Sequence, residues 1–189
     1  MRRLLFFVAL PAAFVGSVSV RSQEVNRGSR QLELNATAAF GCVVRTPRAL
    51  ASSNASFSST GDGGGRVVLT RLVDPDTALP RPSTVELAIP ATCNASHRVT
   101  AISAKGGLGR IGAAGAPGQG FAELLPYALR VNWAGAQVER ASNAGSLALV
   151  IPNGATGDIA LRVATPEGGT PLVAGSYDDT IVIQLQPTD

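Results

Sequence analysis

The sequence is poor in the side chains from which catalytic and metal sites are usually built. Its 189 residues include one histidine and two cysteines, too few ligands for a metal site of the usual kind. A serine hydrolase triad would have to use His97, and no G-x-S-x-G motif accompanies it. We therefore expect no enzyme activity, no metal and no cofactor, and we expect His97 to lie on the surface of a strand.

One glycine motif has the pattern of a nucleotide-binding loop without its context. Residues 107–112 match G-x-G-x-x-G, which holds a dinucleotide only when a helix begins in its second half. The following residues 113–118 are alanine, glycine and proline, a composition that does not sustain a helix. The acidic pair Asp178 and Asp179 does not suit general acid and base catalysis either, because neighbours in a strand point to opposite faces.

Charge is scarce as well. Charged residues make up 15% of the chain, and 16 basic against 13 acidic residues give a net charge of +3. Three of the arginines lie in residues 1–22, so a chain without that segment would carry 13 residues of each sign. A neutral surface exerts no electrostatic attraction on nucleic acid or anionic lipid. We expect neither as a partner.

Only the N-terminus carries a long apolar run, and it has the features of a secretory signal peptide. Arg2 and Arg3 precede an apolar stretch over 4–15, and small residues at 17–19 provide a cleavage site. The competing interpretation is a membrane anchor, but the run is shorter than the ~20 residues that a span needs, and Pro11 interrupts it. We predict a signal peptide over 1–22, no stable membrane anchor, and export through the inner membrane to the periplasm and then the cell surface or medium.

The rest of the chain has the pattern of an antiparallel β-sandwich. Aromatic residues amount to only 5%, and 21 glycines punctuate short apolar runs, which favours strands joined by tight turns. We expect loops over 47–65, with one short strand at 56–59, and over 106–120, and one short helix near 121–125. The expected strands are 66–73, 84–89, 98–103, 127–133, 146–151, 158–164 and 180–186.

The two cysteines, Cys42 and Cys93, predict a disulfide. An even pair in an exported chain is typically oxidised. Such a bond closes a long loop and stabilises the fold by roughly 4 kcal/mol in the chain-entropy model. Three N-x-S/T acceptor patterns begin at Asn35, Asn54 and Asn94; they matter only in a host that glycosylates them.

A strict alternation of apolar and polar residues follows the signal segment. Leu32, Leu34, Ala36 and Ala38 share one face of an extended chain, which predicts a half-buried strand running on towards Cys42. This strand is either the first strand of the sandwich or a separate N-terminal extension over 23–38 that precedes a domain over 39–189.

The C-terminal region resembles a known family. Gly175, Tyr177, Asp179 and Thr180, within Ala174-Gly-Ser-Tyr-Asp-Asp-Thr-Ile-Val-Ile183, are similar to the closing G-x-Y-x-D-T strand of the spore coat protein U domain. The two cysteines and the run from Tyr127 to Trp133 agree with it, and the resemblance covers residues 31–186. These domains are similar to subunits of archaic chaperone–usher pili.

The resemblance implies an immunoglobulin-like sandwich that lacks its last strand. A neighbouring subunit would then supply residues 31–38 as the donor strand, with Leu32, Leu34, Ala36 and Ala38 in the groove. The implied partners are a periplasmic chaperone, an outer-membrane usher and further copies of the subunit, and the implied role is a surface fibre in adhesion or biofilm. The alternative is a monomeric secreted or coat-associated domain that binds a protein or glycan partner. Its candidate surfaces are the 106–120 loop and the region of Trp133, although we expect Trp133 itself to lie in the core.

Overall fold

The computed structural model describes residues 30–113 and 118–188. The predicted signal peptide over 1–22 therefore lies outside the described residues. Contacts divide the chain into a unit over 1–37 and a unit over 38–189, and each is considered by itself. Within the described ranges, no helix is long and apolar enough to cross a membrane.

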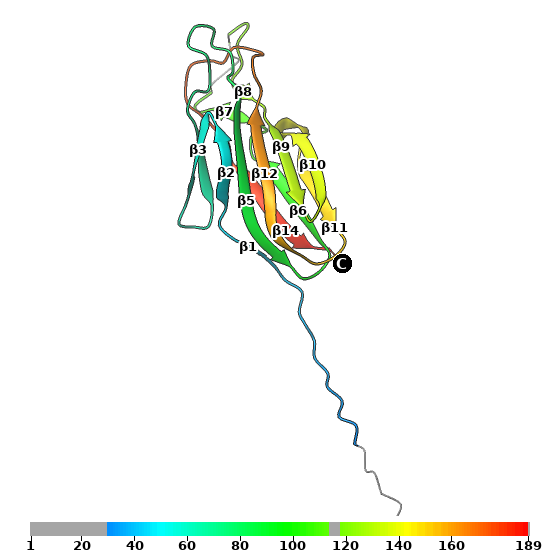
Figure 1. Ribbon diagram of the computed structural model, residues 1–189. Helices are drawn as coiled ribbons and strands as arrows, with labels where there is room; N and C mark the ends of the chain where they lie inside the picture. The colour runs from blue at the N-terminus through cyan, green and yellow to red at the C-terminus, as the bar shows by residue number, and fades with distance from the viewer. Residues whose placement is uncertain (1–29, 114–117, 189) are drawn as a thin grey trace, which may run out of the picture. The chain divides into compact units, whose positions relative to one another are not determined.

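The domain over 38–189 is all β with antiparallel sheets, which confirms the predicted antiparallel β-sandwich. Its larger sheet has six strands. Its two long central strands, β5 and β12, have alternating apolar residues and pair with each other at eleven positions. The order is β1-β5-β12-β9-β10, with β2 also on β5, and Figure 1 shows this sheet in front. Its strands are β1 (Cys42–Val44), β2 (Arg48–Ser53), β5 (Ser83–Cys93), β9 (Ala128–Trp133), β10 (Ala136–Ala141) and β12 (Ala155–Thr165).

Three smaller sheets complete the fold. The second layer, behind the larger sheet in Figure 1, has the order β11-β6-β14. A hairpin of β3 and β4 and a small sheet of β13, β7 and β8 complete the set. Their bounds are β3 (Ala55–Ser59), β4 (Gly65–Leu69), β6 (His97–Ser103), β7 (Leu108–Arg110), β8 (Leu124–Leu125), β11 (Leu147–Ile151), β13 (Tyr177–Asp178) and β14 (Ile181–Pro187).

The core lies between the two layers and is formed by the inward side chains of each strand. Alternation along β5 buries Val85, Leu87 and Ile89, while Glu86 between them stays half-exposed. From the second layer, Val99 and Ala101 of β6 are fully buried. The chain therefore has enough inward apolar side chains to hold a sandwich without any α-helix in the described ranges.

The expectation for His97 is wrong, because its side chain is completely buried. Nε2 accepts a hydrogen bond from Trp133 Nε1 at 2.7 Å, and Nδ1 lies 2.8 Å from the Ala95 carbonyl oxygen. A neutral imidazole with its proton on Nδ1 satisfies both contacts, which makes burial of this polar ring inexpensive. Trp133 lies in the core as expected, exposed by only 2%.

Several predicted elements differ from the observed ones. The region 47–65 contains β2 in addition to β3, which matches the short strand predicted at 56–59, and β7 lies within the predicted loop over 106–120. β10 was not foreseen, and in place of the predicted helix near 121–125 only Leu124 and Leu125 form a strand, β8. Residues 30–41 form no strand. All six residues of β2 are exposed. Its strand therefore cannot be recognised from an alternation of buried and exposed side chains, and it is defined by its pairing with β5.

Candidate functional site

An open groove runs along one side of the sandwich, between β4 and β14. Its volume is about 920 Å³. All five residues of β4 line one side, and Ile181 and Ile183 of β14 line the other. The inner faces of β5 and β12 form its floor, through Val85, Leu87, Ile89, Leu161 and Val163.

The opposite side of the sandwich is closed. There, the edge strands β10 and β11 lie next to each other and are joined through a short 3₁₀ turn at Ser142–Ala144. The Ser142 hydroxyl lies 2.9 Å from the Tyr127 amide nitrogen, whose proton it accepts, and donates to the Gly106 carbonyl at 2.9 Å. The two layers are thus tied together along this side, whereas on the groove side β1 is the strand of the larger sheet that contacts β14.

Most floor residues of the groove are buried, but the apolar side chains along its β14 wall, and Val163 on the floor, are not. Val163 of β12 and Ile181, Ile183 and Leu185 of β14 pack against the core but remain half-exposed. By contrast, Val131 in the middle of the sandwich is fully buried. The groove is therefore an apolar surface that the described residues leave partly uncovered.

One wall of the groove is an unpaired strand edge. β14 pairs with β6, and Thr180 O accepts from Ala104 N while Thr188 N donates to Ser96 O, both at 2.9 Å. Main-chain groups of alternate residues point to alternate sides of a strand. Because even-numbered residues face β6, the N–H and C=O groups of Ile181, Ile183 and Leu185 face the groove side, where no described strand pairs with them.

The other wall is a second unpaired edge. β4 pairs with β3, and at the two ends of this hairpin Thr60 N donates to Gly64 O and Thr70 N to Asn54 O, both at 3.0 Å. The same alternation turns the main-chain groups of Gly65, Val67 and Leu69 away from β3. Among the described residues β4 has no other strand partner. Both walls thus offer rows of free main-chain donors and acceptors.

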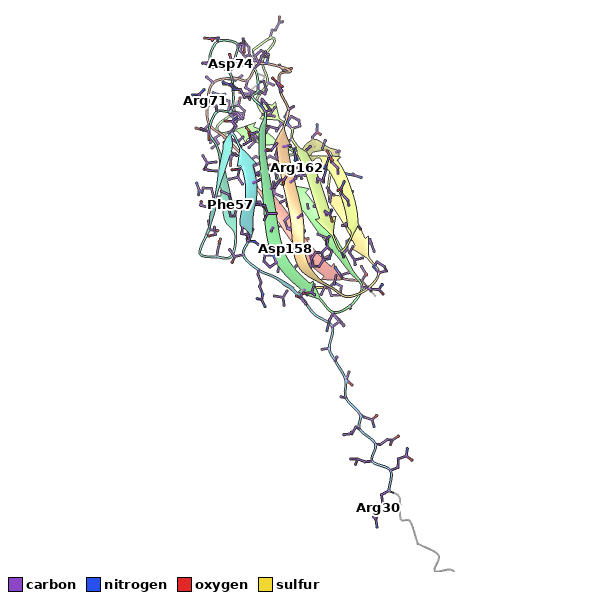
Figure 2. All side chains as sticks on the ribbon, viewed as in Figure 1. Arg30, Phe57, Arg71, Asp74, Asp158 and Arg162 are labelled. Carbon is purple, nitrogen blue, oxygen red and sulfur yellow. A yellow bond between two sulfur atoms is a disulfide. The ribbon has the colours of Figure 1, made fainter. Side chains whose placement is uncertain are left out.

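Phe57 of β3, labelled in Figure 2, packs the hairpin against the core. Its ring covers Gly65, where an added Cβ would lie 2.2 and 2.4 Å from two ring carbons. Glycine at this position therefore lets the aromatic ring cross over the neighbouring strand. This contact holds the β4 wall of the groove in place.

The residues of the C-terminal motif lie at the start of β14. The Asp179 carboxylate accepts hydrogen bonds from the Ser103 hydroxyl, from Tyr127 OH at 2.7 Å, and from the main-chain nitrogens of Lys105 at 3.0 Å and Thr180 at 2.7 Å. Burial alone would raise the pKa of Asp179, but these hydrogen bonds outweigh it and lower the pKa below its ordinary value. This network attaches the beginning of β14 to β6 and to the core.

The other two motif residues shape the turn that precedes β14. The Tyr177 hydroxyl donates to the Val173 carbonyl at 2.7 Å, and burial, as the largest influence, raises its pKa. Gly175 has φ of +151°, and a Cβ there would meet Arg110 Nε at 2.8 Å. Arg110 in turn forms an ion pair with Glu123 at 2.7 Å. The motif thus fixes the position of β14, and Gly175, Tyr177 and Asp179 also line the groove.

The predicted disulfide between Cys42 and Cys93 is present. It joins directly opposed positions of β1 and β5. Asn94 follows it and makes three hydrogen bonds to the chain just before Cys42. Its Oδ1 accepts from Gly41 N at 2.7 Å, its Nδ2 donates to Ala39 O at 2.9 Å, and its own N donates to Gly41 O at 3.2 Å.

Two of the three glycosylation patterns use their asparagine internally. The Asn94 side chain binds the chain at residues 39–41. The Asn54 side chain donates to Arg71 O and Ser83 Oγ, both at 2.7 Å, and accepts from Arg71 N at 2.9 Å. The Asn54 amide connects the β3–β4 hairpin to the start of β5, and the Asn94 amide holds only residues 39–41. The sequence pattern suggested neither role.

The four alternating residues of the predicted donor face are exposed in the structure. Leu32 and Leu34 have 82% and 88% of their surface accessible, and Ala36 and Ala38 are exposed as well. Residues 30–41 form no strand. The alternation is therefore a pattern of apolar side chains that this single chain leaves without strand partners.

The outer face of the larger sheet differs from the groove in carrying paired charges. Arg162 and Asp158, both labelled in Figure 2, form ion pairs with Glu86 at 2.7 Å and with Arg48 at 2.6 Å. Such exposed pairs stabilise little and leave no net charge. The described residues contain no cluster of three or more potential metal ligands.

Comparison with known proteins adds no assignment. The chain matches no protein-family model, no curated protein and no solved structure. The groove and the exposed alternating segment over 31–38 are the two features of the described residues that bear most directly on function.

Proposed function

We propose that this chain is a structural subunit of a bacterial surface fibre, assembled by donor-strand exchange. The observation that supports this most is the groove, whose apolar floor lies between two strand edges without partners. In this proposal the domain is an immunoglobulin-like sandwich lacking one strand. A neighbouring copy provides the missing strand through residues 31–38, as the resemblance to the spore coat protein U domain implies.

The extension and the groove have matching lengths. The seven residues of β14 span about 24 Å at ~3.4 Å per residue, and the eight residues 31–38 span about 27 Å as a strand. Inserted between β4 and β14, the donor would pair on one side with Gly65, Val67 and Leu69 and on the other with Ile181, Ile183 and Leu185. Alternate main-chain groups of one strand can serve both edges at once.

The alternation in the extension supplies the side chains that such a groove needs. A strand with Leu32, Leu34, Ala36 and Ala38 on one face presents all four to the floor, while Glu33 and Asn35 stay in solvent. Burying each leucine contributes roughly 1.5–3 kcal/mol, and each ladder hydrogen bond adds about 1 kcal/mol net. The complex is stabilised by both.

The same groove explains the need for helper proteins. A subunit with half-exposed apolar side chains along its groove, such as Ile181 and Ile183, and with two free strand edges aggregates with other chains in solution. A periplasmic chaperone that supplies a temporary strand prevents this, and an outer-membrane usher exchanges that strand for the extension of the next subunit. This route requires export through the inner membrane, to which the predicted signal peptide and the disulfide chemistry are suited.

A peptide-binding assay tests the proposal directly. A fluorescently labelled peptide with the sequence of residues 30–39 is added in excess to the chain as it refolds by dilution, before copies of the chain can aggregate, and fluorescence anisotropy is followed over time. We expect saturable binding. A peptide with Leu34→Asp, which places a carboxylate against the apolar floor, should bind at least about 1,000-fold more weakly.

A matched control peptide carries Asn35→Asp, which adds the same charge on the opposite face of the strand. It should bind like the unaltered peptide. Equal loss of binding by both variants would show that charge alone matters and would argue against insertion. Absence of binding by every peptide to a folded, monomeric chain would favour the monomeric binding domain instead.

A further inference from the structure

The turn between β5 and β6 holds the chain at the point where the extension ends. Asn94 in this turn contacts residues 39–41 through both atoms of its side-chain amide and through its own main-chain nitrogen. The Ala39 carbonyl is bound one residue after Ala38, the last residue of the donor segment. The Cys42–Cys93 disulfide fixes the chain one residue after Gly41.

Asn94 is itself held from several directions. Gly154, in the turn before β12, lies so close that an added Cβ would come within 3.1 Å of the Asn94 carbonyl carbon. The next residue, Ala95, gives its carbonyl to His97 Nδ1 at 2.8 Å. His97 is bound in the core by Trp133. The turn is thus connected to the centre of the sandwich by a chain of contacts.

The end of the chain adds a further connection. Thr188 N donates to Ser96 O at 2.9 Å, and Ser96 Oγ donates to the Thr188 carbonyl at 2.5 Å. The turn that carries Asn94 is therefore joined to the end of β14, the strand that forms one wall of the groove. The site where the extension is held and the groove are parts of one continuous structure.

We propose that Asn94 is a positioning residue that fixes residues 39–41, the point at which the donor segment begins to leave its own domain. This inference rests on the proposed function. Since Ala39 is already bound where the donor segment ends at Ala38, no free residue separates the donor strand in one subunit from the fixed chain of the next. Successive subunits in a fibre are then joined without slack, and the fibre resists bending.

The observed contacts indicate that Asn94 positions residues 39–41 and contributes little to the stability of the domain. Residues 39–41 are exposed and bury no apolar surface of the core, and the disulfide already fastens β1 to β5. Loss of the Asn94 amide should therefore change the unfolding free energy little. It should free the three residues between the donor segment and Cys42.

The test uses Asn94→Ala in the full-length chain, with Asn132→Ala as the matched control. Asn132 is exposed on β9, and its side chain makes no hydrogen bond to any described residue. In the monomer, we expect exchange of the Gly41 amide hydrogen to quicken about tenfold in Asn94→Ala, as loss of one hydrogen bond allows. In fibres purified from cells, we expect a shorter persistence length in electron micrographs for Asn94→Ala alone.

Asn94→Asp provides a second arm, because a carboxylate keeps the acceptor for Gly41 N and loses the donor to Ala39 O. It should retain protection of the Gly41 amide and give fibres of intermediate stiffness. An unchanged rate of hydrogen exchange at the Gly41 amide in Asn94→Ala would overturn the inference, because it would show that Asn94 does not hold this residue. Faster exchange with equally stiff fibres would overturn the positioning role while leaving donor-strand exchange intact. If the unaltered chain forms no fibres, the proposed function fails, and the positioning role fails with it.

Discussion

Replacement of Leu34 by aspartate should stop assembly without affecting the folded domain. Leu34 is 88% exposed in the single chain, so the substitution removes no intramolecular packing. In the assembled fibre its side chain would lie on the apolar floor formed by residues such as Val85 and Leu161. The effect should therefore appear in assembly alone.

The expected magnitude follows from two contributions. Burial of one leucine contributes about 2–3 kcal/mol, and an unpaired carboxylate in an apolar site costs several kcal/mol more, or is neutralised at a similar cost. A total above about 4 kcal/mol corresponds to an equilibrium at least about 1,000-fold less favourable. Asn35→Asp introduces the same group on the opposite face and should assemble normally.

The assay compares surface fibre yield with the amount of chaperone-bound subunit for the unaltered chain and both variants. We expect Leu34→Asp to give normal chaperone-bound subunit and no fibre. We expect Asn35→Asp to match the unaltered chain in both. An undiminished fibre yield from Leu34→Asp would refute the assignment of the donor face. Failure of that variant to accumulate as chaperone-bound subunit would refute the claim that Leu34 contributes nothing to its own domain.

Three further predictions concern stability. Cys42→Ser opens a loop with a sequence separation of 51 and should lower the unfolding free energy by about 4 kcal/mol; an unchanged urea midpoint would contradict this. Asp179→Asn should remove stability that is present above the ordinary aspartate pKa and is lost as the pH falls through the lowered folded pKa. The urea midpoints of this variant and the unaltered chain should thus converge in acid; a difference that persists at low pH would contradict this. Gly65→Ala should displace the Phe57 ring and lower the thermal midpoint by an amount equivalent to about 1–3 kcal/mol; no shift would show that the ring moves freely.

The central strands could be predicted from the sequence because one face of each is buried. The alternation in 84–89 and 158–164 identifies β5 and β12, although both extend further. The disulfide was predictable from the cysteine count together with the expectation of export. β10 was missed because its pattern, with only Ala136 and Val138 half-buried, lies close to that of a polar loop.

The candidate site could be predicted only in part. Alternation at 32–38 is visible in the sequence, but a strand forms only where a partner edge exists, and residues 30–41 have none in the single chain. The groove lies between the strand edges that remain unpaired once all other strands have paired. No local sequence pattern could therefore identify Gly65–Leu69 as one of its walls. His97 was misplaced because a lone polar ring gives no sign that Trp133 will lie beside it. Asn94 directly follows Cys93, and this adjacency was the one available signal for its role.

The most direct test of donor-strand exchange is the size of the mature exported protein on a denaturing gel, with unheated and boiled samples side by side. Inserted strands held by apolar burial and ladder hydrogen bonds should survive the detergent without heat. We predict a ladder of multimers in the unheated lane that collapses to one monomer band on boiling. A single monomer band in both lanes, from protein shown to be folded, would contradict donor-strand exchange and indicate a sandwich that functions alone.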